Sequence, residues 1–341
     1  MNKTLTMTAF IAAMAMAGCK TAENAGQAAT ANEPAHKNTL LAKSENKHGI
    51  ESFDKLTNDD YREAIIEGMK KQAERIREIA ENNEAPTFKN TIAALDRSGD
   101  ELTRAESTFG PLTSSNSTAE NRALDKELSP LLSAHSDDIY MNQKLFERVK
   151  KVYDEADSTT LNKEEMKVLK NIYKRFERNG ANLSDADKEK LRKLNLEISD
   201  LQLQFSQNLL HETNNTYVTV DRIEDLDGLS QSDIERASAM AAAQGQPGKW
   251  MFNMQRASCN PVLQYCKNRE LRRKVYLAYC NRGDQPNEYN SKEICAKLVR
   301  LRLERAKLMG FKTPADQILD TRMAKTPKAV YDLLDQIWTP A

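Results

Sequence analysis

Glycine and proline are sparse in this sequence, with 12 and 10 among 341 residues. Because these two residues are the main interrupters of helices, long uninterrupted helices are expected. The formal net charge is zero, since 50 Lys and Arg residues balance 50 Asp and Glu residues. A balanced surface gives no electrostatic reason to expect a nucleic acid as partner. The hydrophobic share of 39% is low for a globular protein, but its regular spacing excludes full disorder.

Histidine is rarer still, with four residues, at positions 36, 48, 135 and 211. A metal site of the His-Glu-x-x-His type needs histidines at i and i+4, which place two imidazoles on one ion. The nearest approach, His211-Glu212-Thr213-Asn214-Asn215, lacks the second histidine and is interpreted as the end of a helix. No G-x-S-x-G elbow, Walker loop or dinucleotide-binding fingerprint occurs either. The sequence therefore predicts no catalytic residue and no metal ligand within the chain.

Cysteine is limited to five residues, and none forms a C-x-x-C pair. This spacing excludes a zinc knuckle and a thioredoxin-type motif. Free cysteine is commonly a small buried residue, so we expect Cys259, Cys266, Cys280 and Cys295 to be buried. An oxidising compartment would also permit disulfides among them, with a connectivity that spacing does not give.

The fifth cysteine, Cys19, ends an amino-terminal leader. Lys3 precedes a short apolar run, and Met16-Ala17-Gly18 places small residues directly before the cysteine. This order resembles a bacterial lipobox, in which cleavage leaves a lipidated cysteine. We therefore predict a signal peptide over residues 1–18, lipid attachment at Cys19, a membrane as partner through that anchor, and a location in the bacterial cell envelope, periplasmic or on the surface. The alternative is a plain secretory signal with an incidental cysteine.

Residues 19–48 are rich in Ala, Asn, Glu, Lys and Thr and show little apolar periodicity. We expect a flexible tether that spans about 30 Å on average. From residue 49 onward the apolar spacing is helical, and the stripes are interpreted as core faces. Two short β-branched or aromatic segments are expected to pair as a ribbon. The fold class is thus nearly all-α. The expected elements are helices that start after Thr57, Asn162, Ser184 and Ser230, a helix carrying Leu145, Val149 and Val152, strands over 217–220 and 249–254, and further helices from near Pro261 to the end.

Several separated stretches carry a family resemblance. Residues 268–276 (Asn-Arg-Glu-Leu-Arg-Arg-Lys-Val-Tyr), 278–283 (Ala-Tyr-Cys-Asn-Arg-Gly) and 302–311 (Arg-Leu-Glu-Arg-Ala-Lys-Leu-Met-Gly-Phe) precede Met-Ala-Lys-Thr-Pro at 323–327. Upstream, 86–92 (Pro-Thr-Phe-Lys-Asn-Thr-Ile) and 180–183 (Gly-Ala-Asn-Leu) fit the same order. Together they resemble the peptidyl-dipeptidases of the thimet-oligopeptidase family of zinc metallopeptidases, over roughly residues 50–341.

The resemblance implies a bilobed, nearly all-helical enzyme with a channel between the lobes for oligopeptide substrates. A His-Glu-x-x-His zinc site would activate a water molecule, with the glutamate as general base, and release dipeptides from the substrate's C terminus. In the family these ligands lie beyond the position that matches Ala341. Residues 49–341 are therefore expected to form the amino-terminal lobe, truncated before the zinc-binding region.

Two functional readings remain open. In the first, the chain is part of a lipid-anchored zinc peptidyl-dipeptidase, binds no zinc by itself, is inactive alone and is a monomer. In the second, it is a non-catalytic helical lipoprotein that binds peptides without cutting them.

Overall fold

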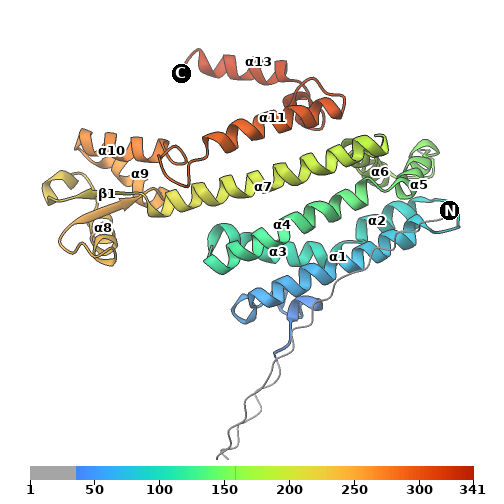
Figure 1. Cartoon of the computed structure of the whole chain (residues 1–341), viewed down its shortest axis with the longest axis horizontal. Coiled ribbons are helices and arrows are strands. Elements are labelled where there is room, and N and C mark those ends of the chain that lie inside the picture. The colour runs from blue at the N-terminus through green and yellow to red at the C-terminus, as the bar shows by residue number, and fades with distance from the viewer. Residues whose placement is uncertain (1–35, 158) are drawn as a thin grey trace, which may run out of the picture. The chain divides into compact units, whose positions relative to one another are not determined.

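The computed structural model describes residues 36–157 and 159–341 (Figure 1). The predicted signal peptide and the lipid-attachment residue Cys19 lie outside these residues, so both stay predictions. Thirteen α-helices and two strands are present in the described part of the chain. The helices are α1 Asn58–Ala80, α2 Ala94–Arg97, α3 Asp100–Ser115, α4 Ala119–Tyr140, α5 Gln143–Asp154, α6 Lys163–Arg178, α7 Asp185–Asn215, α8 Gln231–Ala243, α9 Arg256–Tyr265, α10 Arg269–Cys280, α11 Lys292–Leu308, α12 Pro314–Leu319 and α13 Pro327–Trp338. The strands are β1 Tyr217–Val220 and β2 Trp250–Asn253; a π-helix spans Phe88–Ala93, and 3-10 turns span Thr39–Leu41, Lys47–Gly49, Phe53–Lys55 and Ile223–Leu226.

Side-chain caps set the helix starts where the sequence predicted them. Thr57 and Asp60 form a capping box at α1, and Asn162 and Glu165 form another at α6. The Ser184 hydroxyl accepts a hydrogen bond from the backbone amide of Asp187 at the start of α7. Each cap satisfies backbone donors that the first helical turn leaves without partners. The nearly all-α prediction is confirmed.

Two helices that the spacing did not predict, α3 and α4, lie in the middle of the first half. Each contains a proline inside the helix, Pro111 in α3 and Pro130 in α4. The expected start near Pro261 was also wrong, because α9 begins at Arg256 and carries that proline inside. At all three positions, tertiary packing outweighs the tendency of proline to interrupt a helix.

The two strands pair as an antiparallel ribbon, with Tyr217 opposite Asn253 and Val220 opposite Trp250. The ribbon follows the end of α7, and α8 fills the connection between its strands. Apolar side chains of the ribbon, α8, α9 and α10 form one buried cluster around Phe252 and Val262. The ribbon therefore organises a small helical unit rather than a sheet layer.

Helix α4 packs on α7, which has 31 residues, and α1 and α3 pack against α4 and against each other. Figure 1 shows α1, α3 and α4 on one side of α7 and α11 on the other, and α4 and α11 both contact α7. By helix geometry, α7 extends about 46 Å. It joins the amino-terminal helices to the ribbon unit.

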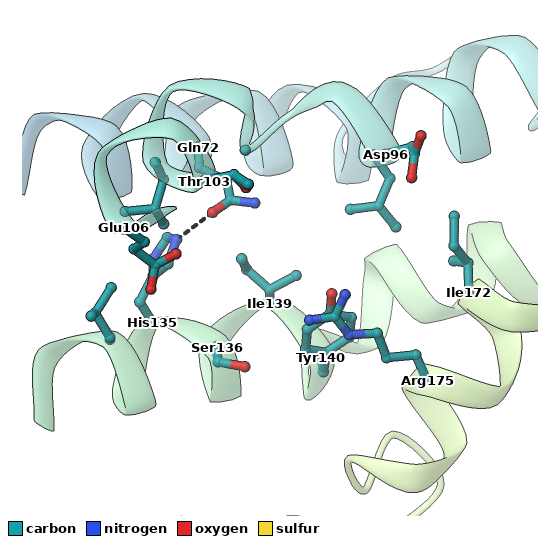
Figure 2. Close-up of a pocket in the computed structure, with 14 residues that line it drawn as sticks. Gln72, Asp96, Thr103, Glu106, His135, Ser136, Ile139, Tyr140, Ile172 and Arg175 are labelled. Carbon is teal, nitrogen blue, oxygen red and sulfur yellow. Dashed lines mark hydrogen bonds between the residues drawn. The ribbon is translucent and has the colours of Figure 1, made fainter. Parts of the chain in front are cut away.

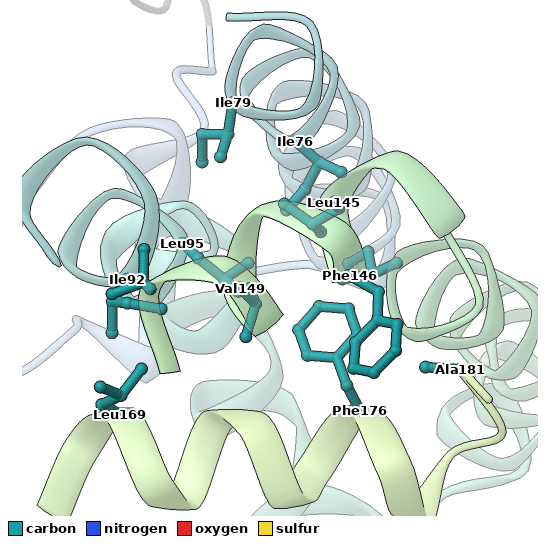
Figure 3. Close-up of a cluster of buried hydrophobic side chains, with 12 residues drawn as sticks. Ile76, Ile79, Ile92, Leu95, Leu145, Phe146, Val149, Leu169, Phe176 and Ala181 are labelled. Carbon is teal, nitrogen blue, oxygen red and sulfur yellow. The ribbon is translucent and has the colours of Figure 1, made fainter. Parts of the chain in front are cut away.

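A buried cluster of aliphatic and aromatic side chains joins the C-terminal part of α1 to α5 and α6 (Figure 3). Phe176 of α6 is 0% exposed, and its ring meets Phe146 at 5.8 Å and Tyr140 at 5.1 Å between centroids. Aromatic pairs in these arrangements stabilise the packing beyond the area they bury. The π-helix contributes Ile92, also 0% exposed, to the same cluster.

The folded unit starts earlier than residue 49, the expected boundary. It begins at Asn38, and the Leu40 side chain is 1% exposed against Tyr61 and Leu102. The Asn38 side chain donates to the carbonyl oxygen of Asp60, and Arg104 donates to that of Leu40. The expected boundary is therefore corrected from residue 49 to Asn38, because Asn38 and Leu40 are both buried against the helices.

Candidate functional site

No residue was predicted to be catalytic or to bind metal, and the predicted lipid site Cys19 lies outside the described residues. Within residues 36–157 and 159–341, no group of three or more His, Cys, Asp or Glu side chains could hold a metal ion. The described residues therefore do not fit a zinc centre, and we derive no zinc chemistry from them. No described helix is long and apolar enough to cross a membrane.

The incomplete zinc motif at the end of α7 has a structural role. The His211 ring stacks on Tyr289, with 3.6 Å between centroids. The neighbouring Glu212 is 2% exposed and accepts hydrogen bonds from the Gly283 amide and the Asn287 side chain, each at 2.6 Å. The interpretation of this stretch as a helix end is confirmed, since α7 ends at Asn215.

The four cysteines of the folded unit are free thiols and divide into two classes. Cys259 and Cys266 are buried, as expected, and burial raises the pKa of both thiols. Cys280 and Cys295 are exposed, so the prediction of burial was wrong for them. Both occupy solvent-facing positions of helices that bury only one stripe.

A groove of about 610 Å³ lies between the α3–α4 hairpin and α7. Its residues are mostly hydroxyl and amide side chains with a few apolar ones between them. They are Thr113, Ser114, Ser117, Arg122, Asp125, Ser129, Ser199, Gln202, Leu203, Phe205, Ser206, Gln207, Leu209, Leu210 and Thr213.

Hydrogen bonds within α4, at its start and between α4 and α7 fix the polar part of this groove. Arg122 donates to the Ser117 carbonyl at 2.9 Å, and Gln207 of α7 donates to the Arg122 carbonyl at 3.3 Å. Asp125 accepts the Ser129 hydroxyl at 3.3 Å, and burial raises the pKa of its carboxyl. Fixed donors and acceptors beside apolar side chains suit an extended peptide, whose backbone offers both kinds of partner.

The apolar stripe of α7 divides at this groove. Its first part, through Leu191, Ile198 and Leu201, is buried as expected. Phe205 and Leu209, which were also interpreted as core, are only half-buried and line the groove. The sequence carried one signal of this change: Gln202, Ser206 and Gln207 gather beside the stripe only in its second part.

Comparison with known proteins identifies a family. Residues 262–340 match peptidase family M3. The chain is 34% identical to the dipeptidyl carboxypeptidase of Escherichia coli over 300 residues, which covers 88% of this chain and 44% of that enzyme. It is 33% identical to the dipeptidyl carboxypeptidase of Salmonella typhimurium over 304 residues, 89% of this chain and 45% of the enzyme. Oligopeptidase A of Haemophilus influenzae is 28% identical over 296 residues, 86% of this chain and 43% of that protein.

These matches confirm the resemblance to the thimet-oligopeptidase family, and the chain is similar to peptidases of family M3. Among those peptidases it is similar both to dipeptidyl carboxypeptidases and to oligopeptidases A. The chain spans about half the length of the curated relatives that it matches.

Proposed function

We propose that this chain forms the amino-terminal lobe of a zinc metallopeptidase that releases dipeptides from the C termini of oligopeptides. The observation that carries this proposal is the 34% identity to a dipeptidyl carboxypeptidase across 88% of the chain. Zinc and the general base would belong to the remainder of the enzyme, because the described residues offer no ligand cluster. The lobe alone is expected to be inactive.

The groove between the α3–α4 hairpin and α7 is the part of the lobe that we propose contacts the substrate. It presents Arg122 and Asp125 near rows of hydroxyl groups, with Leu203 and Phe205 as apolar contacts. An extended peptide could pair its backbone amides with the fixed polar groups, while one of its side chains packs against Leu203. The lobe would then contribute binding energy and leave the reaction to zinc-bearing residues elsewhere.

The test is peptide binding by the purified chain, measured by fluorescence anisotropy with a labelled nonapeptide that has a free C terminus. Leu203→Asp and Arg122→Gln are each expected to weaken binding at least tenfold, because they remove an apolar contact and a fixed cation from the groove. Arg97→Gln, a change at an exposed arginine of α2, should leave the affinity unchanged. Equal affinity of all variants would refute the groove assignment.

A parallel measurement addresses the catalytic part of the proposal. Mass spectrometry of the incubated peptide should show no cleavage, and metal analysis should find less than one zinc per chain. Cleavage with one zinc per chain would contradict the proposal that the zinc site lies in the remainder of the enzyme.

The membrane location is proposed separately, and it rests on the leader sequence alone. We infer that Cys19 carries the lipid and that the folded unit lies on the periplasmic or outer side of the envelope. Cys19→Ser should abolish incorporation of radiolabelled fatty acid and move the protein from the membrane fraction to the soluble fraction. Unchanged labelling would refute the anchor.

A further inference from the structure

A second hollow, separate from the groove, lies between the four long helices α1, α3, α4 and α6, and the short helix α2 adds Leu95 and Asp96 to its wall (Figure 2). It has a volume of about 280 Å³ and shares no lining residue with the groove. Part of its wall is apolar, formed by Leu95, Leu102, Leu132, Ile139 and Ile172. This site is called the four-helix cavity below.

One end of the four-helix cavity carries a carboxylate without a cationic partner. Figure 2 shows Glu106 of α3 at the same end as His135 of α4, whose Nε2 lies 2.8 Å from Oε1 of Gln72. The Gln72 side-chain amide also donates to the Ser98 hydroxyl at 3.3 Å. The polar groups of Gln72, Ser98 and His135 are therefore hydrogen-bonded to one another. Within the described chain, Glu106 makes no ion pair and no hydrogen bond.

The electrostatics of this end favour an incoming cation. The Glu106 side chain is partly exposed to solvent, but the protein around its carboxyl still raises the pKa of that group. No nearby cation opposes this effect. Burial also lowers the pKa of His135, so its imidazole is neutral at pH 7 and supplies no charge. A ligand ammonium group would find a carboxylate with no competing partner.

The other end carries a guanidinium without an acceptor. Arg175 reaches from α6 across the Tyr140 ring, with its Cζ 4.5 Å from the ring centroid. A cation over an aromatic face is held in place without losing its hydrogen-bond donors. In the part of the chain that the structure describes, the Arg175 side chain has no carboxylate within ion-pair distance, although Asp96 lines the same cavity.

We propose that the four-helix cavity binds a small zwitterion, a free amino acid or a dipeptide, with its ammonium group at Glu106 and its carboxylate at Arg175. Arginine can bind a carboxylate through two parallel hydrogen bonds. The apolar wall would take the ligand side chain. A volume of about 280 Å³ lies at the lower limit of ordinary ligand pockets, which favours a ligand of this size. The inference does not depend on the proposed peptidase function.

Isothermal titration of the chain with Ala-Leu and with free leucine tests the proposal. At least one of these zwitterions should bind, and N-acetyl-leucine and leucinamide, which each lack one charge, should bind at least tenfold more weakly. A preference for Ala-Leu or for leucine then tells which of the two sources fits the cavity. No binding of either zwitterion at millimolar concentration, or equal binding of the blocked forms, would overturn the proposal.

Single substitutions test which end of the four-helix cavity binds the ammonium group and which binds the carboxylate. Arg175→Gln and Glu106→Gln should each weaken zwitterion binding at least tenfold, while Arg97→Gln, at a neighbouring exposed position, should not. Asp96→Asn should bind at least as tightly as the parent, since it removes a carboxylate from the Arg175 end. Circular dichroism and the thermal midpoint show whether each variant is folded. Folded Arg175→Gln with parental affinity, or a tenfold loss in Asp96→Asn, would overturn the assigned orientation.

The groove and the cavity are tested independently. Leu203→Asp should impair binding of the labelled nonapeptide and leave zwitterion binding intact, and Arg175→Gln should do the reverse. Failure of one proposal is thereby distinguished from failure of the other.

Discussion

The Glu212 carboxylate accepts a hydrogen bond of 2.6 Å from the backbone amide of Gly283, 71 residues further along the chain. Its second oxygen accepts the Asn287 side-chain amide. These bonds tie the connection between α10 and α11 to the end of α7. The glutamate of the incomplete His-Glu-x-x-His motif thus joins two separate parts of the chain.

Replacing Glu212 should destabilise the fold. Glu212→Ala leaves the buried Gly283 amide without an acceptor, so we expect the free energy of unfolding to fall by about 2–4 kcal/mol. Glu212→Gln keeps one acceptor oxygen and should cost about half as much. Urea denaturation followed by circular dichroism measures both. Glu304→Gln, at an exposed position of α11, serves as the control and should be neutral within about 0.5 kcal/mol.

Asp137 of α4 should make stability depend on pH. The residue is 7% exposed and accepts the Asn195 side-chain amide at 2.8 Å, and burial raises the pKa of its carboxyl to about 6. The folded state therefore holds this proton more tightly than the unfolded chain does. The contribution of Asp137 to stability falls as the pH rises from about 4 to about 6, and the ionised carboxylate is unfavourable above that range.

Asp137→Asn removes the charge and keeps an oxygen for Asn195. It should raise the free energy of unfolding at pH 7.5 by about 1–2 kcal/mol and have little effect at pH 4. Denaturation of both proteins across this pH range gives the comparison. Asp138→Asn, at a side chain that is 70% exposed, is the matched control. The same difference at both pH values would rule out the linkage.

Gly68 lets α1 approach α3 closely. A Cβ atom at this position would lie 2.8 Å from the Cα atom of Leu102, a contact with backbone that cannot rotate away. Gly68→Ala should therefore reduce stability by about 1–3 kcal/mol despite the better helix propensity of alanine. Gly110→Ala, in α3, meets nothing within 4 Å and should instead be neutral or stabilising. A stabilised Gly68→Ala protein would contradict this packing argument.

The apolar face of α13 should promote association. None of its residues is buried, and Leu334, Ile337 and Trp338 are 50%, 57% and 83% exposed. The double change Leu334→Glu and Ile337→Glu should raise the monomer fraction at high concentration without lowering the free energy of unfolding. Multi-angle light scattering over a concentration series measures this. Leu131→Glu, which changes an exposed leucine of α4, should leave association as it was.

Local chemistry made much of the helical pattern predictable. The caps at Thr57, Asn162 and Ser184 act within one helical turn, so their signal is contained in a few neighbouring residues. The ribbon was equally predictable, because β1 consists of β-branched and aromatic residues and β2 carries the aromatic residues Trp250 and Phe252. Helices α3 and α4 were missed because Pro111 and Pro130 suggest interruption, whereas packing against α1 and α7 outweighs that local preference.

The two proposed binding sites could not be predicted from the sequence, for a different reason. The groove brings Arg122 against Gln207, and the cavity places Glu106 and Arg175 at opposite ends of one hollow, across long stretches of sequence. Nothing in the spacing of these residues encodes such neighbours, because helix–helix contacts depend on which faces meet. The family resemblance supplied a function without supplying these residues, and only the packed helices identify them.

The buried side chains form four clusters rather than one continuous core in the described part of the chain. Such a fold opens in parts, each with its own free energy. Amide hydrogen exchange should therefore show several protection levels, with the ribbon unit around Phe252 exchanging as one group. The helices around Phe176 should exchange as another. Long α7, which spans these regions, would set how far an opening at one end spreads toward the other.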